Sequence, residues 1–115
     1  MARIGYVELP VRDTGAAKAF YGAAFGWAFT DYGPTYAATT TAAATGGTDI
    51  GFQADPAERS IAALPVVAVD DLDAALVAVE AAGGVVTAPV FAFPGGRRFH
   101  FRDPDGHELA VAQAG

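Results

Sequence analysis

The sequence predicts an α+β domain made of two tandem βαβββ modules, whose strands form a curved mixed sheet with the helices on its outer face. The chain repeats itself: Val-Arg-Asp-Thr-Gly-Ala-Ala at 11–17 returns as Val-Asp-Asp-Leu-Asp-Ala-Ala at 69–75. Each copy passes from a Val- and Leu-rich strand to an Asp and then to apolar residues at helical spacing. Short strands separated by Gly and Pro follow each helix. Because 115 residues are too few for two independent domains, the modules, at about 1–57 and 58–115, share one domain.

The first module opens with a strand that ends before Asp13, the predicted N-cap of its helix. Its apolar stripe consists of Ala17, Phe20, Tyr21, Ala24 and Phe25. Gly26 is the expected helix stop. Three short strands are predicted after it, at 27–32, 35–41 and 48–53, with turns at 33–34 and 45–47.

The second module repeats this order, with Asp71 as the predicted N-cap and Gly83 and Gly84 as the helix stop. The apolar residues of its helix are Leu72, Ala75, Leu76 and Val79. The predicted strands are 85–88, a short strand ending near 94–96, and a hairpin of 97–101 with 108–112. The hairpin turn is Asp-Pro-Asp-Gly at 103–106, in which Pro fixes φ and Gly accepts a positive φ.

Alternation along the strands assigns side chains to the two faces of the sheet. The helix face receives Leu9, Val11, Phe99 and Phe101. The concave face receives Tyr6, Glu8, Arg98 and His100, with Gln53 nearby. Four polar or amphipathic groups on one face predict a water-accessible ligand pocket, because burying them without partners would cost about 1–3 kcal/mol for each group.

Composition excludes several classes of function. Seven Lys and Arg against thirteen Asp and Glu give a net charge of −6, so nucleic acid is not an expected partner. The N-terminus carries charges where a signal peptide needs an apolar region, and the chain has no stretch of roughly 20 strongly apolar residues. A cytoplasmic protein without membrane contact is therefore expected. The absence of cysteine excludes disulfides, thiolate metal sites and a cysteine nucleophile.

Each candidate site residue has a functional and a structural interpretation. Glu8 is either a general base or anchor for a cationic ligand, or a structural carboxylate that is solvated or paired with Arg98. His100 has a side chain suited to proton transfer, yet a cavity-wall histidine bonded to a neighbour is the favoured interpretation, because histidine alone specifies no reaction. Of Arg97 and Arg98, alternation leaves only Arg98 to clamp a carboxylate. The aromatic residues expected near the cleft mouth, which suit an apolar ligand or core packing, are Trp27, Tyr32, Tyr36, Phe91 and Phe93.

Several segments resemble the vicinal oxygen chelate proteins, the glyoxalase/bleomycin-resistance family. Three runs of this chain resemble the opening of those proteins: Val-Glu-Leu-Pro-Val-Arg-Asp at 7–13, Ala-Lys-Ala-Phe-Tyr at 17–21 and Phe-Gly-Trp at 25–27. The second module is similar at 69–75 and at Glu-Ala-Ala-Gly-Gly, 80–84, and the final hairpin at Phe-Arg-Asp-Pro-Asp-Gly, 101–106. The resemblance covers nearly the whole chain and implies two paired βαβββ modules around a concave cleft.

The same resemblance implies where a metal ion would be bound. Metal-dependent members take one His, Glu or Gln from each of four strands, at positions that correspond here with Tyr6, Gly51, Leu64 and Ala110. None of these is a ligand of that type, so we predict neither a metal ion nor another cofactor. A one-residue strand shift would bring Glu8 or Glu108 to a ligand position, but it would also reverse the alternation of that strand.

Three classes of function follow from these observations. The first is a metal-free protein that binds a small organic molecule in the cleft. The second is an enzyme, either a metal-dependent lyase, isomerase or dioxygenase with non-standard ligands, or a metal-free acid/base catalyst using Glu8 and His100. The third is an inert, dimerising accessory domain. A homodimer is expected because so short an open sheet leaves apolar edges, with the modules paired within one chain or swapped between two. The sequence leaves the ligand, and whether any reaction is catalysed, open.

Overall fold

The computed structural model describes residues 2–40 and 47–115, which form two compact units. We call Gly5–Leu64 the N-terminal module. The C-terminal module is Pro65–Gly115, grouped with the chain start up to Ile4. The boundary expected at about residue 57 falls between the strand that ends at Gln53 and the strand that begins at Leu64, and it stays a prediction.

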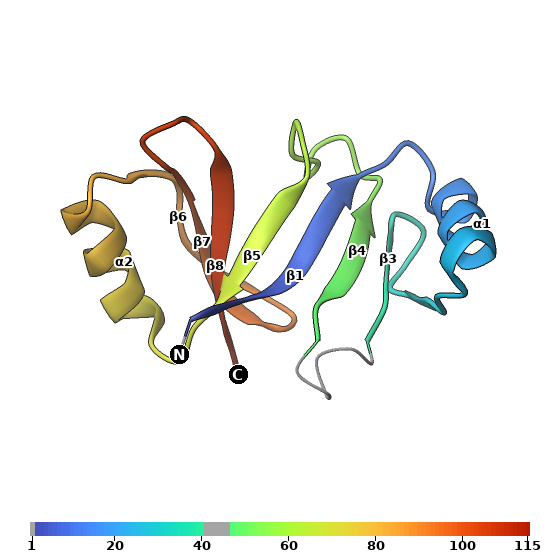
Figure 1. The fold of residues 1–115 in the computed structure, drawn as a ribbon, viewed down its shortest axis with the longest axis horizontal. Helices are drawn as coiled ribbons and strands as arrows, with labels where there is room; N and C mark the ends of the chain where they lie inside the picture. Colours follow the sequence, from blue (N-terminus) through green and yellow to red (C-terminus); the bar gives the residue numbers. More distant parts are fainter. Residues whose placement is uncertain (1, 41–46) are drawn as a thin grey trace. The chain divides into compact units, whose positions relative to one another are not determined.

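The N-terminal module has the order βαβββ (Figure 1). Its elements are β1 (Arg3–Pro10), α1 (Thr14–Phe25), β2 (Thr30–Asp31), β3 (Tyr36–Ala38) and β4 (Asp49–Gln53). The strands lie in the order β2-β3-β4-β1. β1 and β4 are parallel, whereas the β2–β3 and β3–β4 pairs are antiparallel.

The C-terminal module repeats this order, which confirms the predicted α+β class and the tandem repeat. Its elements are β5 (Leu64–Ala68), α2 (Leu72–Ala81), β6 (Val85–Phe93), β7 (Gly96–Arg102) and β8 (Glu108–Ala114). The strands lie in the order β5-β8-β7-β6, with β5 and β8 parallel and the other two pairs antiparallel.

Both predicted helix starts are confirmed. The carboxylate of Asp13 accepts a hydrogen bond of 2.9 Å from the amide of Ala16, and that of Asp71 accepts one of 3.0 Å from Ala74. α1 ends at Gly26, whose φ of 72° is the left-handed conformation that glycine adopts without strain. Within the described part of the chain, neither helix is long and apolar enough to cross a membrane.

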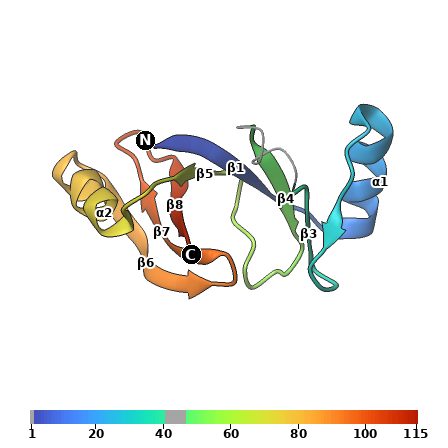
Figure 2. The ribbon, with the colours of Figure 1, turned by 90° about the horizontal axis from the view of Figure 1, so that it is seen from below.

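The strand boundaries differ from the prediction in two places. The strands expected at 27–32 and 35–41 shrink to Thr30–Asp31 and Tyr36–Ala38, and residues 41 and 45–46 of those predictions lie outside the described ranges. The two strands expected between 85 and 94 are a single strand, β6, which bends strongly (Figure 2). Its pairing with β7 shifts register on both sides of Ala88, and such irregularities bend a strand without ending it.

The core of the C-terminal module confirms the predicted alternation of the last hairpin. Leu72, Phe99 and Val111 are buried together, and Phe101 packs against them. Apolar side chains of α2, among them Leu76 and Val79, cover the same cluster. Phe99 and Phe101 therefore lie on the α2 face of their sheet, and His100 between them points to the opposite face.

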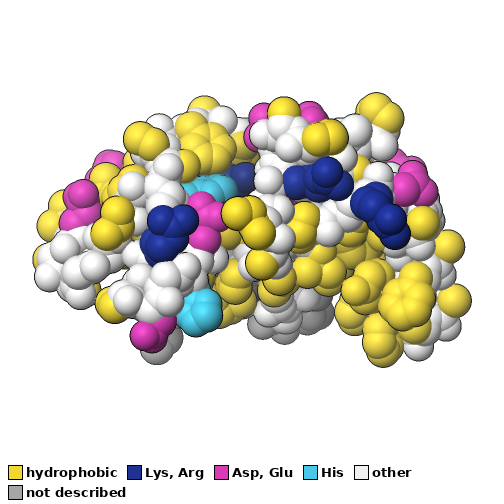
Figure 3. Space-filling view, turned by 90° about the horizontal axis from the view of Figure 1, so that it is seen from above, with side chains coloured by type: hydrophobic (Ala, Val, Ile, Leu, Met, Phe, Trp, Pro, Cys, Tyr) yellow, Lys and Arg dark blue, Asp and Glu magenta, His cyan; other side chains and the backbone are white. Residues whose placement is uncertain are grey.

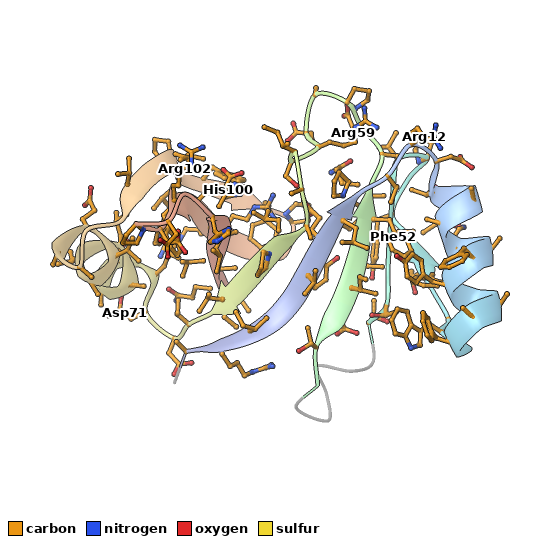
Figure 4. The ribbon with its side chains drawn as sticks, turned by 45° about the horizontal axis from the view of Figure 1, so that its top comes forward. Arg12, Phe52, Arg59, Asp71, His100 and Arg102 are labelled. Carbon is orange, nitrogen blue, oxygen red and sulfur yellow. The ribbon has the colours of Figure 1, made fainter. Side chains whose placement is uncertain are left out.

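In the N-terminal module, Phe52 of β4 is the buried contact beneath α1 (Figure 4). Its ring centroid lies 5.3 Å from that of Tyr21 and 5.1 Å from that of Phe29. Leu9 is in register with Phe52 and so belongs to the predicted helix face. Val11, expected there as well, lies beyond the last residue of β1.

The predicted apolar stripe of α1 is only partly correct. Tyr21 reaches the sheet, but Phe20 and Phe25 remain 63% and 60% exposed. The reason is the small sheet beneath the helix, since β2 and β3 have two and three residues and offer too little surface for all of its apolar side chains.

Candidate functional site

The N-terminal module presents a cluster of tyrosine and carboxylate groups on the sheet face opposite α1. Glu8 precedes Leu9 in β1 and therefore points away from the helix, as does Tyr6. Tyr36 of β3 joins them, although β3 and β1 are separated by β4. We call Tyr6, Tyr36 and Glu8 the tyrosine–carboxylate cluster.

Hydrogen bonds join the three side chains in a row. The hydroxyl of Tyr36 donates to Oε1 of Glu8 over 3.1 Å, and the hydroxyl oxygens of Tyr6 and Tyr36 are 2.5 Å apart. Because a phenol has a single proton, a Tyr36 hydroxyl that donates to Glu8 must accept from Tyr6. The protons of the row therefore point from Tyr6 toward the carboxylate.

Burial sets the protonation of this cluster. Glu8 is 3% exposed, which corrects the expectation that it would be accessible to water. Burial raises the pKa of Tyr6 to about 12, with smaller upward effects from the charges of Glu8 and Asp49 and a partial offset from the Tyr36 hydrogen bond. Burial, followed by Tyr6 and Glu8, raises the pKa of Tyr36 well above its ordinary value. Both phenols are consequently neutral at physiological pH.

Gly51 leaves the space that these tyrosines occupy. It pairs with Glu8 across the β1–β4 ladder, and a Cβ at this position would overlap the hydroxyl oxygen of Tyr6 and lie 2.7 Å from its Cζ. A side chain at position 51 is therefore incompatible with the observed position of Tyr6.

Gln53 ends β4 in the same module, and its side chain belongs to the following loop. Its Oε1 accepts a hydrogen bond of 3.0 Å from the amide of Asp55, and its carbonyl accepts from the amide of Val11. Its strand partner is Tyr36. Gln53 thus borders the tyrosine–carboxylate cluster, while its hydrogen bonds with Asp55 and Val11 stabilise the turn after β4.

The C-terminal module has a polar cluster of its own on the face opposite α2. Nδ1 of His100 lies 3.6 Å from Oε2 of Glu108, and the hydroxyl of Thr87 donates to that same oxygen over 3.0 Å. The side chains of His100 and Glu108 are 16% and 34% exposed. Figure 4 shows His100 among the side chains of this sheet.

Arg98 lies two residues before His100 on β7 and is held against aromatic rings. Its guanidinium carbon is 5.2 Å from the ring centroid of Phe91 and 5.4 Å from that of Phe93. These are cation–π distances. The ring of Phe91 also lies 5.7 Å from that of His100. The aromatic walls expected from Phe91 and Phe93 are thus beside Arg98 and His100.

The predicted site residues therefore belong to two clusters. Tyr6, Glu8 and Gln53 lie in the N-terminal module, and Arg98 and His100 lie in the C-terminal module. That all five line one pocket stays a prediction.

Sequence reasoning undervalued two residues of these clusters. Tyr36 was expected only as an aromatic wall, yet its hydroxyl connects Tyr6 with Glu8. Glu108 was weighed only as a shifted metal ligand, yet it lies beside His100. The sequence could have predicted the contact of Glu108, because a carboxylate on the strand next to that of His100 can form a cross-strand pair with the histidine.

The residues at the metal-ligand positions do not fit a metal ion. Tyr6 is a neutral phenol placed over Gly51, and Leu64 and Ala110 are 1% and 0% exposed apolar residues. Across residues 2–40 and 47–115, no group of three or more His, Cys, Asp or Glu side chains is arranged to hold an ion. The hard or borderline cations that bind oxygen and nitrogen would find too few donors here.

A separate groove of about 500 Å³ opens in the N-terminal module. It is lined by Gly26, Trp27, Ala28, Phe29, Thr30, Thr39, Thr40, Thr48 and Ile50. The hydroxyl of Thr39 donates to Asp49 and accepts from the amide of Ile50, so it stabilises the sheet. The groove is neutral and lies apart from the tyrosine–carboxylate cluster, because Ile50 and Gly51 point to opposite faces of β4.

Comparisons with known proteins agree with the motifs. The model of the Glyoxalase/Bleomycin resistance protein/Dioxygenase superfamily matches residues 3–111. No curated protein matches the chain.

Among solved structures, the Mn(II)-bound glyoxalase of Novosphingobium aromaticivorans is 28% identical with a TM-score of 0.69, over 98% of this chain and 40% of its own. A glyoxalase/bleomycin resistance protein/dioxygenase superfamily member from Vibrio splendidus is 15% identical with a TM-score of 0.69, over 99% of each chain. The NAD-dependent benzaldehyde dehydrogenase of Legionella pneumophila gives a TM-score of 0.75 at 17% identity, over 96% of this chain and 98% of its own. At these last two identities, the likeness is one of fold.

Proposed function

Because the chain belongs to the Glyoxalase/Bleomycin resistance protein/Dioxygenase superfamily, we propose that it binds a small organic molecule without the help of a metal ion. The tyrosine–carboxylate cluster is the main anchor in this proposal. A cytoplasmic location is part of this proposal.

One observation carries the proposal, namely that Tyr6 occupies the space a side chain at position 51 would need. Tyr6 and Gly51 thus stand at two of the positions where metal-dependent relatives carry ligands. Neutral phenols are poor ligands for divalent ions, whereas they are good hydrogen-bonding groups for an organic molecule.

The direction of the hydrogen bonds indicates the chemistry of the ligand. Since the protons of Tyr6 and Tyr36 point toward Glu8, Tyr6 offers lone pairs to any further partner. An incoming group would therefore donate, as a hydroxyl, an amide N–H or an ammonium does. The net charge of −6 favours neutral or cationic ligands over anionic ones.

The experiment compares matched pairs of compounds on the full chain. Phenols and anilines would be screened beside their O-methyl or N,N-dimethyl counterparts, with affinity measured by calorimetry and by the rise in melting temperature. We expect the donor compounds to bind at least about tenfold more tightly than their methylated counterparts.

Tyr6→Phe should remove this preference, because it deletes the accepting oxygen. Tyr21→Phe is the matched control, since it removes a hydroxyl on the α1 face of the same module and should leave the preference intact. Equal binding of donor and methylated compounds, or equal effects of the two variants, would contradict the proposal.

A metal-dependent lyase, isomerase or dioxygenase is the second candidate, favoured by the 28% identity to a Mn(II)-bound glyoxalase. Elemental analysis separates the two candidates. One tightly held ion per chain, together with turnover of a 1,2-dicarbonyl or catechol compound, would support the enzyme.

A further inference from the structure

Glu8 differs from the surface carboxylates of this protein in its burial. Figure 3 shows acidic side chains at the surface of one face of the molecule, whereas Glu8 is 3% exposed. A buried carboxylate needs hydrogen-bond donors in place of water, so a group that donates to it is held firmly. The hydroxyl of Tyr36 is such a donor, at 3.1 Å. The charge of Glu8 therefore fixes the direction of the Tyr36 hydroxyl.

The direction set at Glu8 is passed on to Tyr6. An ionised carboxylate accepts hydrogen bonds but has no proton to donate, and a phenol has one proton. Tyr36 uses its proton on Glu8, so the bond of 2.5 Å between the two phenols uses the proton of Tyr6. The polarity that Tyr6 presents to a ligand is thus determined two hydrogen bonds away from that ligand.

The packing around Gly51 keeps the two phenols together. β4 lies between β1 and β3, and the side chains of Tyr6 and Tyr36 meet over it. A Cβ at Gly51 would overlap the hydroxyl oxygen of Tyr6 and lie 2.5 Å from that of Tyr36. Burial raises the pKa of both phenols, so each keeps its proton at neutral pH.

An intact row of this kind has two arrangements. In one, Tyr6 donates to Tyr36 and Tyr36 donates to position 8, which leaves Tyr6 as an acceptor. In the other, position 8 donates to Tyr36, Tyr36 donates to Tyr6, and Tyr6 donates to the ligand. The second arrangement needs a proton on the side chain at position 8, which a carboxylate lacks.

We propose that Glu8 is the positioning residue that sets ligand specificity at this site, because its charge, acting through Tyr36, holds Tyr6 as a hydrogen-bond acceptor. This inference rests on the proposed function, in which Tyr6 contacts the ligand. It adds the class of ligand that the site rejects. Ketones, carboxylates and phenolates have only lone pairs at their polar end, and these would face the lone pairs of Tyr6. A side chain at position 8 that donates would reverse the row and admit them.

Glu8→Gln tests the proposal on the full chain. Glutamine has nearly the shape of glutamate and also accepts from Tyr36, but its amide group can donate as well. Calorimetry would measure the affinities for phenol, anisole and acetophenone, the last of which is a neutral acceptor. We expect the wild type to bind phenol at least about tenfold more tightly than acetophenone, and this ratio to fall about tenfold in Glu8→Gln. Comparing one ratio between two variants cancels the difference in ligand size.

Glu58→Gln is the matched control. It removes the same charge from an exposed position in the loop after β4, and it should leave the ratio unchanged. Circular dichroism and urea unfolding check that the variants are folded. If Glu8→Gln does not fold, Tyr36→Phe decides, because it removes the acceptor of the Tyr6 proton and should lower the ratio as well.

Neutron diffraction from crystals exchanged into D₂O reads the row without any ligand. The deuterium of Tyr6 should lie between the two phenol oxygens, and that of Tyr36 should point to Glu8. A wild type that binds phenol and anisole equally would overturn the proposed function and this inference with it. The inference alone is overturned by an unchanged ratio in Glu8→Gln, by an equal fall in Glu58→Gln, or by a Tyr36 deuterium that points to Tyr6.

Discussion

Tyr36 is the residue on which the polar part of the N-terminal module depends. Its hydroxyl accepts from Tyr6 and donates to the buried carboxylate of Glu8. A water-accessible Glu8 would tolerate Glu8→Ala at a cost of no more than about 1 kcal/mol. With Glu8 3% exposed, removing it leaves the Tyr36 hydroxyl without its acceptor, and we now expect a loss of about 1–3 kcal/mol.

Tyr36→Phe should destabilise the protein by about 1–3 kcal/mol, because it removes two hydrogen bonds and withdraws a donor from a buried carboxylate. Tyr6→Phe removes one hydrogen bond at the end of the row and should cost about 0.5–1.5 kcal/mol. Urea unfolding of both variants measures the difference. An equal loss from the two would show that Tyr36 does not link the other two groups.

The tyrosine cluster also predicts a loss of stability at high pH. The pKa of Tyr6 is about 12 in the folded protein against 10.0 for an unperturbed tyrosine. The unfolded chain therefore loses this proton first, and the stabilisation, complete below pH 10, declines as the pH rises from about 10 to 12. The pKa of Tyr36 shifts in the same direction.

Melting temperatures measured from pH 8 to pH 12 test this expectation. The fall in melting temperature with rising pH should be smaller in the Tyr6→Phe, Tyr36→Phe double variant, in which the perturbed phenols are absent. Absorbance of the tyrosinate at 295 nm gives the same information directly, and an unchanged titration in the double variant would contradict the assignment.

Among the secondary-structure elements, β4 lies between the two strands that carry the tyrosine–carboxylate cluster, and Gly51 is its critical position. Gly51→Ala should destabilise the protein by about 1–3 kcal/mol, because the new Cβ collides with Tyr6. Tyr6→Leu should recover part of this loss, since the shorter side chain withdraws the two Tyr6 atoms, while the Tyr36 hydroxyl remains 2.5 Å from the new Cβ. A double-mutant cycle measured in urea gives the coupling energy. Strictly additive losses would mean that Tyr6 does not lie over Gly51.

Three consecutive residues of β7 alternate between the two faces of their sheet: Phe99 and Phe101 lie on the α2 face, and His100 lies on the opposite face. Phe99→Ala should cost about 3–5 kcal/mol, because Phe99 is 0% exposed in contact with Leu72 and Val111. His100→Ala, on the opposite face, should cost clearly less, about 1 kcal/mol. The reverse ranking in denaturant melts would show that the hairpin has a different register.

At the scale of the whole molecule, the residues at all four metal-ligand positions of the family lack the expected donors. We expect the purified protein to carry no stoichiometric zinc, nickel, iron or manganese. Adding Mn²⁺ or a chelator should shift the melting temperature by less than about 1 °C, since an ion without a site does not stabilise the folded state. Elemental analysis checks the first expectation, and calorimetric melting checks the second. A melting temperature that rises with the concentration of Mn²⁺ would contradict both.

The sequence by itself determined the features that depend on local geometry or on a short period. The helix caps at Asp13 and Asp71, the turn before His107 and the alternation of Phe99 with His100 are all confirmed, because each rests on residues a few positions apart. The repeat predicted the order of the elements for the same reason, since each copy specifies its own helix and strands.

Only the tertiary structure decided which side chains meet across the sheets. The contact of Tyr36 with Glu8 depends on the register of β3 with β4 and of β4 with β1, which hydrogen bonds between distant segments establish. The exposure of Phe20 and Phe25 depends on how little sheet lies beneath α1, and no helical period reports that. Alternation assigns a side chain to one face of the sheet, but the residue that it contacts on that face depends on strands that are remote in the sequence.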